Sequence, residues 1–246
     1  MTFIGIDLGW QTGPTGLCHL HGGPTGLTLA NLNHQPTHPD VLAWLDQKAP
    51  PDRPAIVAVD APIIIPNPVG MRLPDRLAHR YFGKYHAGCY PANLSRPFAP
   101  LLLGFSEALM ARGFHHAPTL VPQQPGRYQV EVFPHPAMVH LFRLSRILKY
   151  KKGRLAERRA ELSRLRSLIL EYLPQHTPAL HIKATELPGI PKRGAALKAV
   201  EDQLDSLICA YAAAHWWYWG LARNWVLGDL AEGYIIVPVP NGEVKG

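Results

Sequence analysis

Two short apolar runs in the first sixty residues each end in an aspartate. Residues 3–6 are too few for a helix and lead into Asp7, and residues 55–59 lead directly into Asp60. Runs of this length, bounded by polar residues and Gly or Pro, are typical of buried β-strands. The pattern therefore predicts two strands that deliver Asp7 and Asp60 to the edge of a sheet.

Three weaker patterns extend this sheet. Thr15–Leu20 and Leu27–Asn31 flank the turn-like Gly22-Gly23-Pro24, which indicates an antiparallel meander that includes the first strand. Tyr128–Phe133 is a further strand pattern, and it contains a third acid, Glu131. The chain therefore has five strand patterns for its main sheet.

Helical periodicity appears mainly in the second half of the chain. The segments predicted to be helical, apart from one in the Pro-rich region, are Pro39–Lys48, Pro136–Leu148, Leu155–Tyr172 and Leu197–Gly220. A last strand is predicted at Tyr234–Val239, and Pro238 suggests that it lies at an edge. The fold class expected is α/β, with a mixed five-stranded sheet flanked by helices in one domain over residues 1–246.

Residues 61–128 form a long Pro-rich insertion after the strand that ends at Asp60. One helix, Pro100–Gly113, is predicted within it, and the rest has no clear period. Long irregular connections in a compact domain are commonly functional or disordered. We expect an ordered segment over the site, because Arg72, Arg76 and Arg96 lie there beside tyrosines and are suited to phosphate contacts. The alternative is a surface excursion without function.

Positive charge is concentrated in one segment. The chain carries 25 Lys and Arg, 18 Asp and Glu, and a net charge of +7. Ten of the basic residues and only two of the acids lie between Arg143 and Arg166, so this stretch carries +8 and the remainder −1. Residues 143–173 are therefore read as a basic segment with an amphipathic helix, suited to a polyanion such as nucleic acid. A solvated helix face is the alternative.

The last long helix carries two acids three residues apart, Asp202 and Asp205. Residues three apart are neighbours on a helix surface, so these carboxylates repel each other. Beyond Asp205 the helix is apolar on every side, which predicts that it is buried between layers. A cation or an arginine is needed to compensate this pair.

Buried acids are costly unless a counter-charge compensates them, and oxygen ligands without a competing Cys/His cluster favour Mg²⁺ or Mn²⁺. We expect Asp7 to bridge two such ions, with Asp60 and Asp205 completing the site. Lys149 and Lys151 are expected to offset phosphate charge. The alternative is that some of these acids form salt bridges or cap helices, and either helical aspartate remains a possible ligand.

Several motifs together resemble a known family. They are Gly5-Ile6-Asp7, Val59-Asp60-Ala61-Pro62, Glu131-Val132-Phe133-Pro134-His135-Pro136, Lys149-Tyr150-Lys151, Glu201-Asp202-Gln203-Leu204-Asp205-Ser206-Leu207 and Glu232-Gly233-Tyr234-Ile235. The chain is similar to a domain-of-unknown-function family of predicted ribonuclease H-fold nucleases, and distantly to Holliday-junction-resolvase-like nucleases.

The resemblance implies a ribonuclease H-like fold with Asp7, Asp60 and Asp205 as metal ligands. Asp202 would be the second acid of the resolvase-like pair. A catalytic role for Glu131 and a substrate contact for His135 follow only from the motif of this family.

The function predicted is a Mg²⁺- or Mn²⁺-dependent nuclease that hydrolyses nucleic-acid phosphodiester bonds by a two-metal-ion mechanism. One alternative is a non-catalytic nucleic-acid-binding or scaffolding protein that keeps the fold. A third is an ATP-dependent phosphotransferase of the actin-like type, which would need a second domain and a second Asp-x-Gly phosphate loop.

The surroundings of the protein are expected to be reducing. The three cysteines have no metal-ligand spacing, which favours free thiols in a cytoplasmic protein. No apolar run is long enough to cross a bilayer, and the N-terminus reads as a strand rather than a secretion signal. We therefore expect nucleic acid, and no membrane, as the partner.

Overall fold

The computed structural model describes residues 1–10, 13–23 and 25–240. Its strands are β1 (Thr2–Asp7), β2 (Thr15–Gly23), β3 (Gly26–Gln35), β4 (Ala55–Val59), β5 (His115–His116), β6 (Arg127–Glu131), β7 (Leu180–His181), β8 (Asn224–Asp229) and β9 (Gly233–Pro238). Its α-helices are α1 (His38–Lys48), α2 (Leu73–Phe82), α3 (Ala99–Met110), α4 (Pro134–Leu141), α5 (Leu155–Tyr172) and α6 (Gly194–Trp219).

The main sheet has seven strands in the order β5-β6-β4-β1-β2-β3-β7. β1, β2 and β3 form the antiparallel meander, and β4 and β6 run parallel to β1. The predicted α/β class and mixed sheet are confirmed, but the count of five strands is wrong. The two additional strands, β5 and β7, are only two residues long each, too short to give a periodic signal in the sequence.

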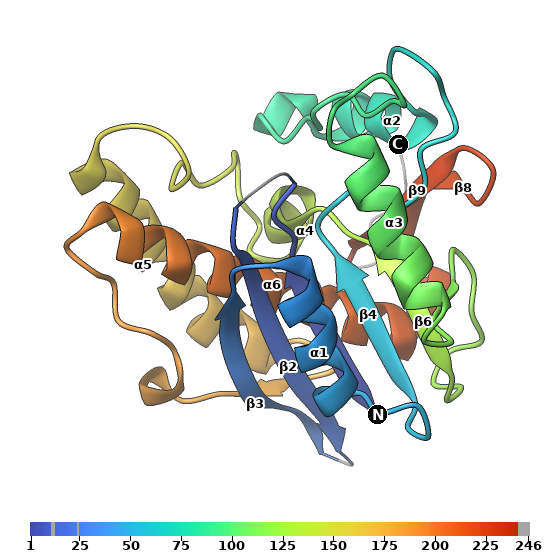
Figure 1. The fold of residues 1–246 in the computed structure, drawn as a ribbon. Coiled ribbons are helices and arrows are strands. Elements are labelled where there is room, and N and C mark those ends of the chain that lie inside the picture. Colours follow the sequence, from blue (N-terminus) through green and yellow to red (C-terminus); the bar gives the residue numbers. More distant parts are fainter. Residues whose placement is uncertain (11–12, 24, 241–246) are drawn as a thin grey trace.

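Helices cover both faces of the sheet. Figure 1 shows α1 and α3 in front of the sheet and α6 behind it. Successive strand residues point to opposite faces. Accordingly, Ile4 and Ile6 join the core with α1 and α3, whereas Phe3 joins the core with α6. The buried, largely apolar α6 expected from the sequence is present, with residues 204–216 buried throughout.

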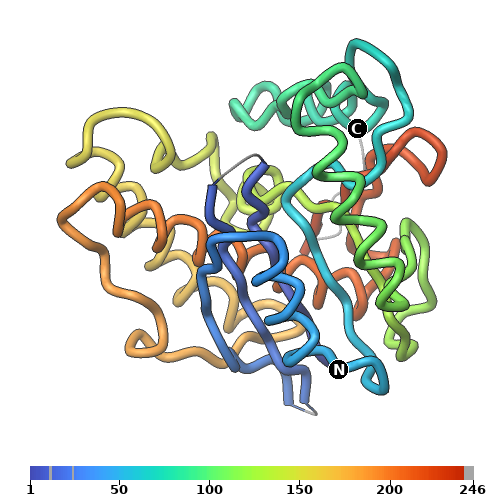
Figure 2. The backbone as a smooth tube through the Cα atoms, in the orientation of Figure 1, coloured from blue at the N-terminus to red at the C-terminus, as the bar shows by residue number. Residues whose placement is uncertain are grey.

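The region after α6 differs from the prediction. Tyr234–Val239 was expected as an edge strand, and β9 is one strand of a separate two-stranded sheet with β8, which was not predicted. Among the described residues, one isolated bridge, Val132 with Ile236, joins the two sheets. Figure 2 shows this hairpin beside α2, although some 140 positions of sequence lie between them. Tyr81 and Phe82 of α2 pack on Trp225 of β8, with ring centroids 5.6 and 5.9 Å away.

Residues 61–128 are more regular than expected, because they contain α2 as well as α3. Pro74 suggested a break, but it lies in the first turn of α2, where a missing N–H costs nothing. In contrast, α4 is shorter than predicted. It ends at Leu141, and Arg143 follows with a left-handed φ of 52°. Among the described residues, no helix is both apolar and long enough to cross a bilayer.

Two glycines let α6 lie directly on the sheet. A Cβ atom on Gly5 would be 1.9 Å from the carbonyl oxygen of Ser206. A Cβ atom on Gly16 would be 2.1 Å from the carbonyl oxygen of Asp202. Gly16 is paired with Asp7 across β1 and β2. The absence of a side chain at position 16 therefore brings the backbone of Asp202 next to Asp7.

Gly16→Ala should separate α6 from the sheet at this point. The added methyl group meets backbone rather than a flexible side chain, and we expect a loss of about 1–3 kcal/mol in the free energy of unfolding. Urea denaturation measures this loss. Gly13→Ala is the matched control, because nothing lies within 4 Å of a Cβ at that position. Equal stability of the two variants would contradict the close contact between α6 and β2.

Candidate active site

Four aspartates gather where β1 and β4 end. Asp7 is the last residue of β1, and Asp60 directly follows the parallel β4, so both lie at the same end of the sheet. Ile6 and Val59 are neighbours in register and face α1 and α3. The next residues, Asp7 and Asp60, must therefore face α6.

α6 supplies the other two acids. Asp202 and Asp205 are 1% and 0% exposed. Their charges act on Asp7 across the contact between α6 and the sheet. The four residues that the sequence placed together, Asp7, Asp60, Asp202 and Asp205, thus occupy one region of the structure.

A cavity of about 450 Å³ opens at this region. The acidic, basic and histidine residues that line it are Asp7, Asp60, His135, Lys151, Lys198 and Asp202. Asp205 is fully buried behind them. Of the residues expected to bind substrate, His135 and Lys151 line this cavity.

Lys151 is the central counter-ion of the aspartates. Its Nζ lies 2.7 Å from Oδ2 of Asp205. Burial alone would lower the pKa of Lys151, but the carboxylates of Asp205 and Asp7 raise it well above its usual value. Lys151 was expected to meet phosphate, whereas in the structure its ammonium group already compensates the acids.

The remaining polar contacts orient the acids on α6. Tyr150 donates a 2.6 Å hydrogen bond to Oδ1 of Asp205. Lys198 forms an ion pair with Asp202, and Nε2 of His34 lies 3.2 Å from the same carboxylate. Tyr150, Lys198 and His34 were not identified from the sequence as site residues. Two of them had a usable signal, because Lys198 precedes Asp202 by one helical turn and Tyr150 lies within the motif Lys149-Tyr150-Lys151.

Asp7 is compensated less completely. Its Oδ2 is buried and has no hydrogen-bond partner among the described residues. Burial raises the pKa of Asp7 well above the usual value, and the charges of Asp205 and Asp202 raise it further, against the effect of Lys151. The pKa of Asp60 is raised in the same way, mainly by burial. Burial also raises the pKa of Asp202, to about 6.

Glu131 does not join these aspartates. It is in register with Val59, so its side chain points to the opposite face from Asp60. There Arg72 holds it with two hydrogen bonds, of 2.7 and 2.8 Å, and the amide of Ile63 donates a third. The carboxylate is thereby fully used in a structural ion pair, which argues against the catalytic role expected for it.

The arginines of the insertion also lie elsewhere than expected. Arg72 is 2% exposed and bonded to Glu131 and Asp75, so it is not available to a substrate. Arg76 is exposed and lies 3.8 Å from Glu232. Arg96 stacks on the ring of Tyr90 at 5.1 Å. None of the three lines the acid cavity, but Tyr90 does.

The basic segment is partly structural. Arg158, Arg159 and Arg166 bond to backbone carbonyl groups of neighbouring segments. Lys149 is exposed and lines a different hollow, of about 280 Å³, with Arg146, Lys152 and Arg164.

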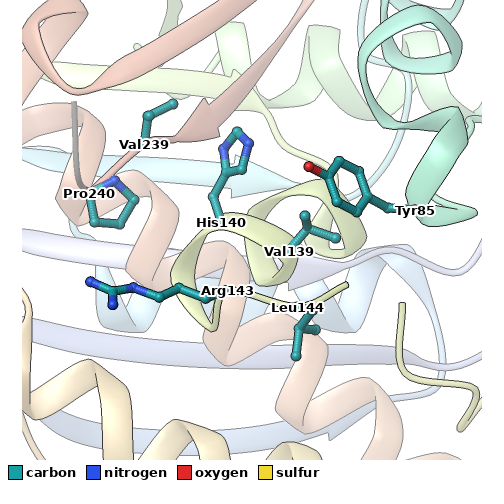
Figure 3. Close-up of a pocket in the computed structure, with 7 residues that line it drawn as sticks. All are labelled: Tyr85, Val139, His140, Arg143, Leu144, Val239 and Pro240. Carbon is teal, nitrogen blue, oxygen red and sulfur yellow. The ribbon is translucent and has the colours of Figure 1, made fainter. Parts of the chain in front are cut away.

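Another hollow, of about 340 Å³, lies beside the end of α4 (Figure 3). It shares no lining residue with the acid cavity.

Four aspartates face two lysines, so the fully ionised site has two negative charges in excess. Its donors are oxygen atoms, which suit Mg²⁺ or Mn²⁺, and Oδ2 of Asp7 is an unused buried ligand atom. The site therefore fits a divalent cation in charge and donor type. In the described residues, however, no three His, Cys, Asp or Glu side chains are already placed to hold an ion. Lys151 and the carboxylates would have to shift for a metal to bind.

The fold and this site define an α/β protein with an acid cluster at the carboxyl ends of two parallel strands. The chain belongs to the family described as "Protein of unknown function (DUF429)", whose model matches residues 5–226. The matched range includes all four aspartates. The comparison with curated proteins found no match, and neither did the comparison with solved structures.

Asp7→Asn should stabilise the metal-free protein at alkaline pH. The pKa of Asp7 is higher in the folded protein than in the unfolded chain. At pH values between these two pKa values the folded state therefore binds more protons than the unfolded state. The free energy of unfolding then falls as pH rises through the folded-state pKa. The neutral amide avoids this cost. We expect a gain of about 1–3 kcal/mol at pH 8, with a higher melting temperature in EDTA.

The gain should shrink toward pH 4, where Asp7 is protonated in the folded protein. Asp52→Asn is the matched control, because Asp52 is exposed and lies before the other end of β4. A lower melting temperature of Asp7→Asn at pH 8 would show that the Asp7 carboxylate is well compensated.

Proposed function

We propose that this protein is a metal-dependent hydrolase of nucleic-acid phosphodiester bonds with a ribonuclease H-like fold. The observation that carries the proposal is the meeting of Asp7, Asp60 and Asp202 at one cavity, with Asp205 buried behind them and a buried carboxylate oxygen of Asp7 without a hydrogen-bond partner among the described residues. An acid on the first strand of a meander, an acid that ends the fourth strand and acids on a late helix are the pattern of that fold.

Asp7, Asp60 and Asp205 would hold Mg²⁺ or Mn²⁺, and Asp202 is the further candidate ligand. When bound, the metal supplies a polarised water and stabilises charge on the phosphate, by the two-ion mechanism expected from the sequence. The two surplus negative charges of the site support binding of at least one divalent ion.

The side chains of this protein have separate tasks. Lys151 and Lys198 line the cavity and offset the charge of an entering phosphate. Tyr150 fixes the orientation of the Asp205 carboxylate through its 2.6 Å hydrogen bond. His135 is neutral at pH 7, because burial and Lys151 lower its pKa to about 4. It can therefore give or take a hydrogen bond without adding charge.

The non-catalytic alternative also has an observation in its favour. Lys151 already compensates Asp205, as expected in a protein that needs no metal. Metal binding and cleavage therefore have to be measured separately.

Cleavage should depend on the acid cluster. Single-stranded, duplex, hybrid and branched nucleic acids are incubated with Mg²⁺ or Mn²⁺ and analysed on denaturing gels. We expect Asp60→Asn to lower the rate at least 100-fold, since the amide is a weaker metal ligand and carries no charge. Asp52→Asn should cleave at the wild-type rate. Cleavage by Asp60→Asn at the rate of the control would refute the assignment.

Lys151→Ala should bind Mn²⁺ more tightly than the wild type, by about tenfold, because it removes an ammonium group that competes for Asp205. Calorimetric titration measures the affinity. Lys149→Ala is the control, because Lys149 is exposed and does not line the acid cavity. If Mn²⁺ neither binds nor raises the melting temperature of any variant, the protein is the non-catalytic alternative.

A further inference from the structure

The acid cavity is lined by aromatic rings as well as by charged groups. Trp10, Tyr90 and Phe133 line it together with the charged residues. The same three rings and Asp60 also line a smaller hollow, of about 50 Å³, together with Arg72, Asp75 and Glu131. Ring surfaces and the charged groups of the acid cluster thus line one cavity.

The rings are held in place by their neighbours. Trp10 donates a 3.2 Å hydrogen bond to the carbonyl oxygen of Asp60, and its ring lies 4.8 Å from that of Phe98. Tyr90 contacts Phe98 edge-on at 6.4 Å, and the guanidinium group of Arg96 stacks on it. Even so, Tyr90 is 59% exposed. Phe98 and Arg96 thus contact the ring, while a large part of Tyr90 remains free for a ligand.

From this arrangement we infer that the cleft takes up a single unpaired nucleotide, whose base stacks on Tyr90 while its phosphate lies toward Lys151 and Lys198. A base inside a duplex is stacked on both faces and cannot offer one to a protein ring, whereas an unpaired base can. The volume of about 450 Å³ is that of a small-ligand site. The substrate class is therefore single-stranded or frayed nucleic acid.

This inference rests on the proposed function, and binding without turnover tests it separately. Ca²⁺ replaces Mg²⁺, and fluorescence anisotropy measures the affinity for oligo-dT, oligo-U, a duplex and an abasic strand of equal length. Tyr90→Ala should weaken binding of the preferred single strand about tenfold or more, because base stacking on an aromatic ring contributes substantially to affinity. Tyr90→Phe keeps the ring and should stay within about twofold of the wild type.

Leu94→Ala is the matched control, because Leu94 is an exposed apolar residue of the same insertion. It should leave all affinities unchanged, and melting curves check that each variant is folded. The abasic strand should bind the wild-type protein as weakly as Tyr90→Ala binds the intact strand. The two homopolymers show whether the single strand is DNA or RNA.

Tight binding of the duplex, or unchanged affinity of Tyr90→Ala for single strands, would overturn the inference. Cleavage of duplexes that depends on Asp60 but not on Tyr90 would also overturn it, yet would leave the proposed function intact. Conversely, single-strand binding that requires Tyr90, without cleavage of any substrate, would support the inference and refute the nuclease.

Discussion

The close contact between α6 and the first two strands determines the rest of the site. Gly5 and Gly16 have no side chain that would hold the helix away, and the carbonyl groups of Ser206 and Asp202 occupy the space that a Cβ would need. Packing of apolar surface around this contact buries α6 on every side beyond Asp205. The same packing holds Asp202 and Asp205 close to Asp7, although their like charges repel each other. The hydrophobic core thus stabilises an unfavourable electrostatic arrangement.

Strand alternation separates two groups of charges at the same end of the sheet. On the face toward α6, Asp7 and Asp60 have an excess of negative charge and an unused ligand atom. On the opposite face, Arg72 binds Glu131 and Asp75 with almost every donor that it has. The group around Asp7 and Asp60 can respond to a ligand. In the group around Arg72 the charges are fully paired, and this group attaches the insertion to the sheet.

Much of the architecture could be predicted from local pattern. The first four full strands, α1, α5 and α6 were all predicted, the second and third strands from weaker patterns, and their positions agree with the structure to within about four residues. The grouping of Asp7, Asp60, Asp202 and Asp205 was also predictable. The orientation of Glu131 away from the aspartates could also have been predicted. Its neighbours Val130 and Val132 are apolar and face α6, so strand alternation turns Glu131 to the opposite face. The role of Lys151 was not, because it depends on how an irregular segment folds back onto Asp205.

The attachment of the insertion by Arg72 has a consequence for kinetics. A buried charged triad is strongly destabilised when one member leaves. The amide of Ala92 donates a hydrogen bond to Asp75 of this triad, which anchors the neighbouring segment that carries Tyr90. The surface that we propose for the base is therefore formed before any ligand arrives. The rate of ligand association should therefore be limited by diffusion and by desolvation of the entering group. No slow closing of the insertion over the ligand is expected.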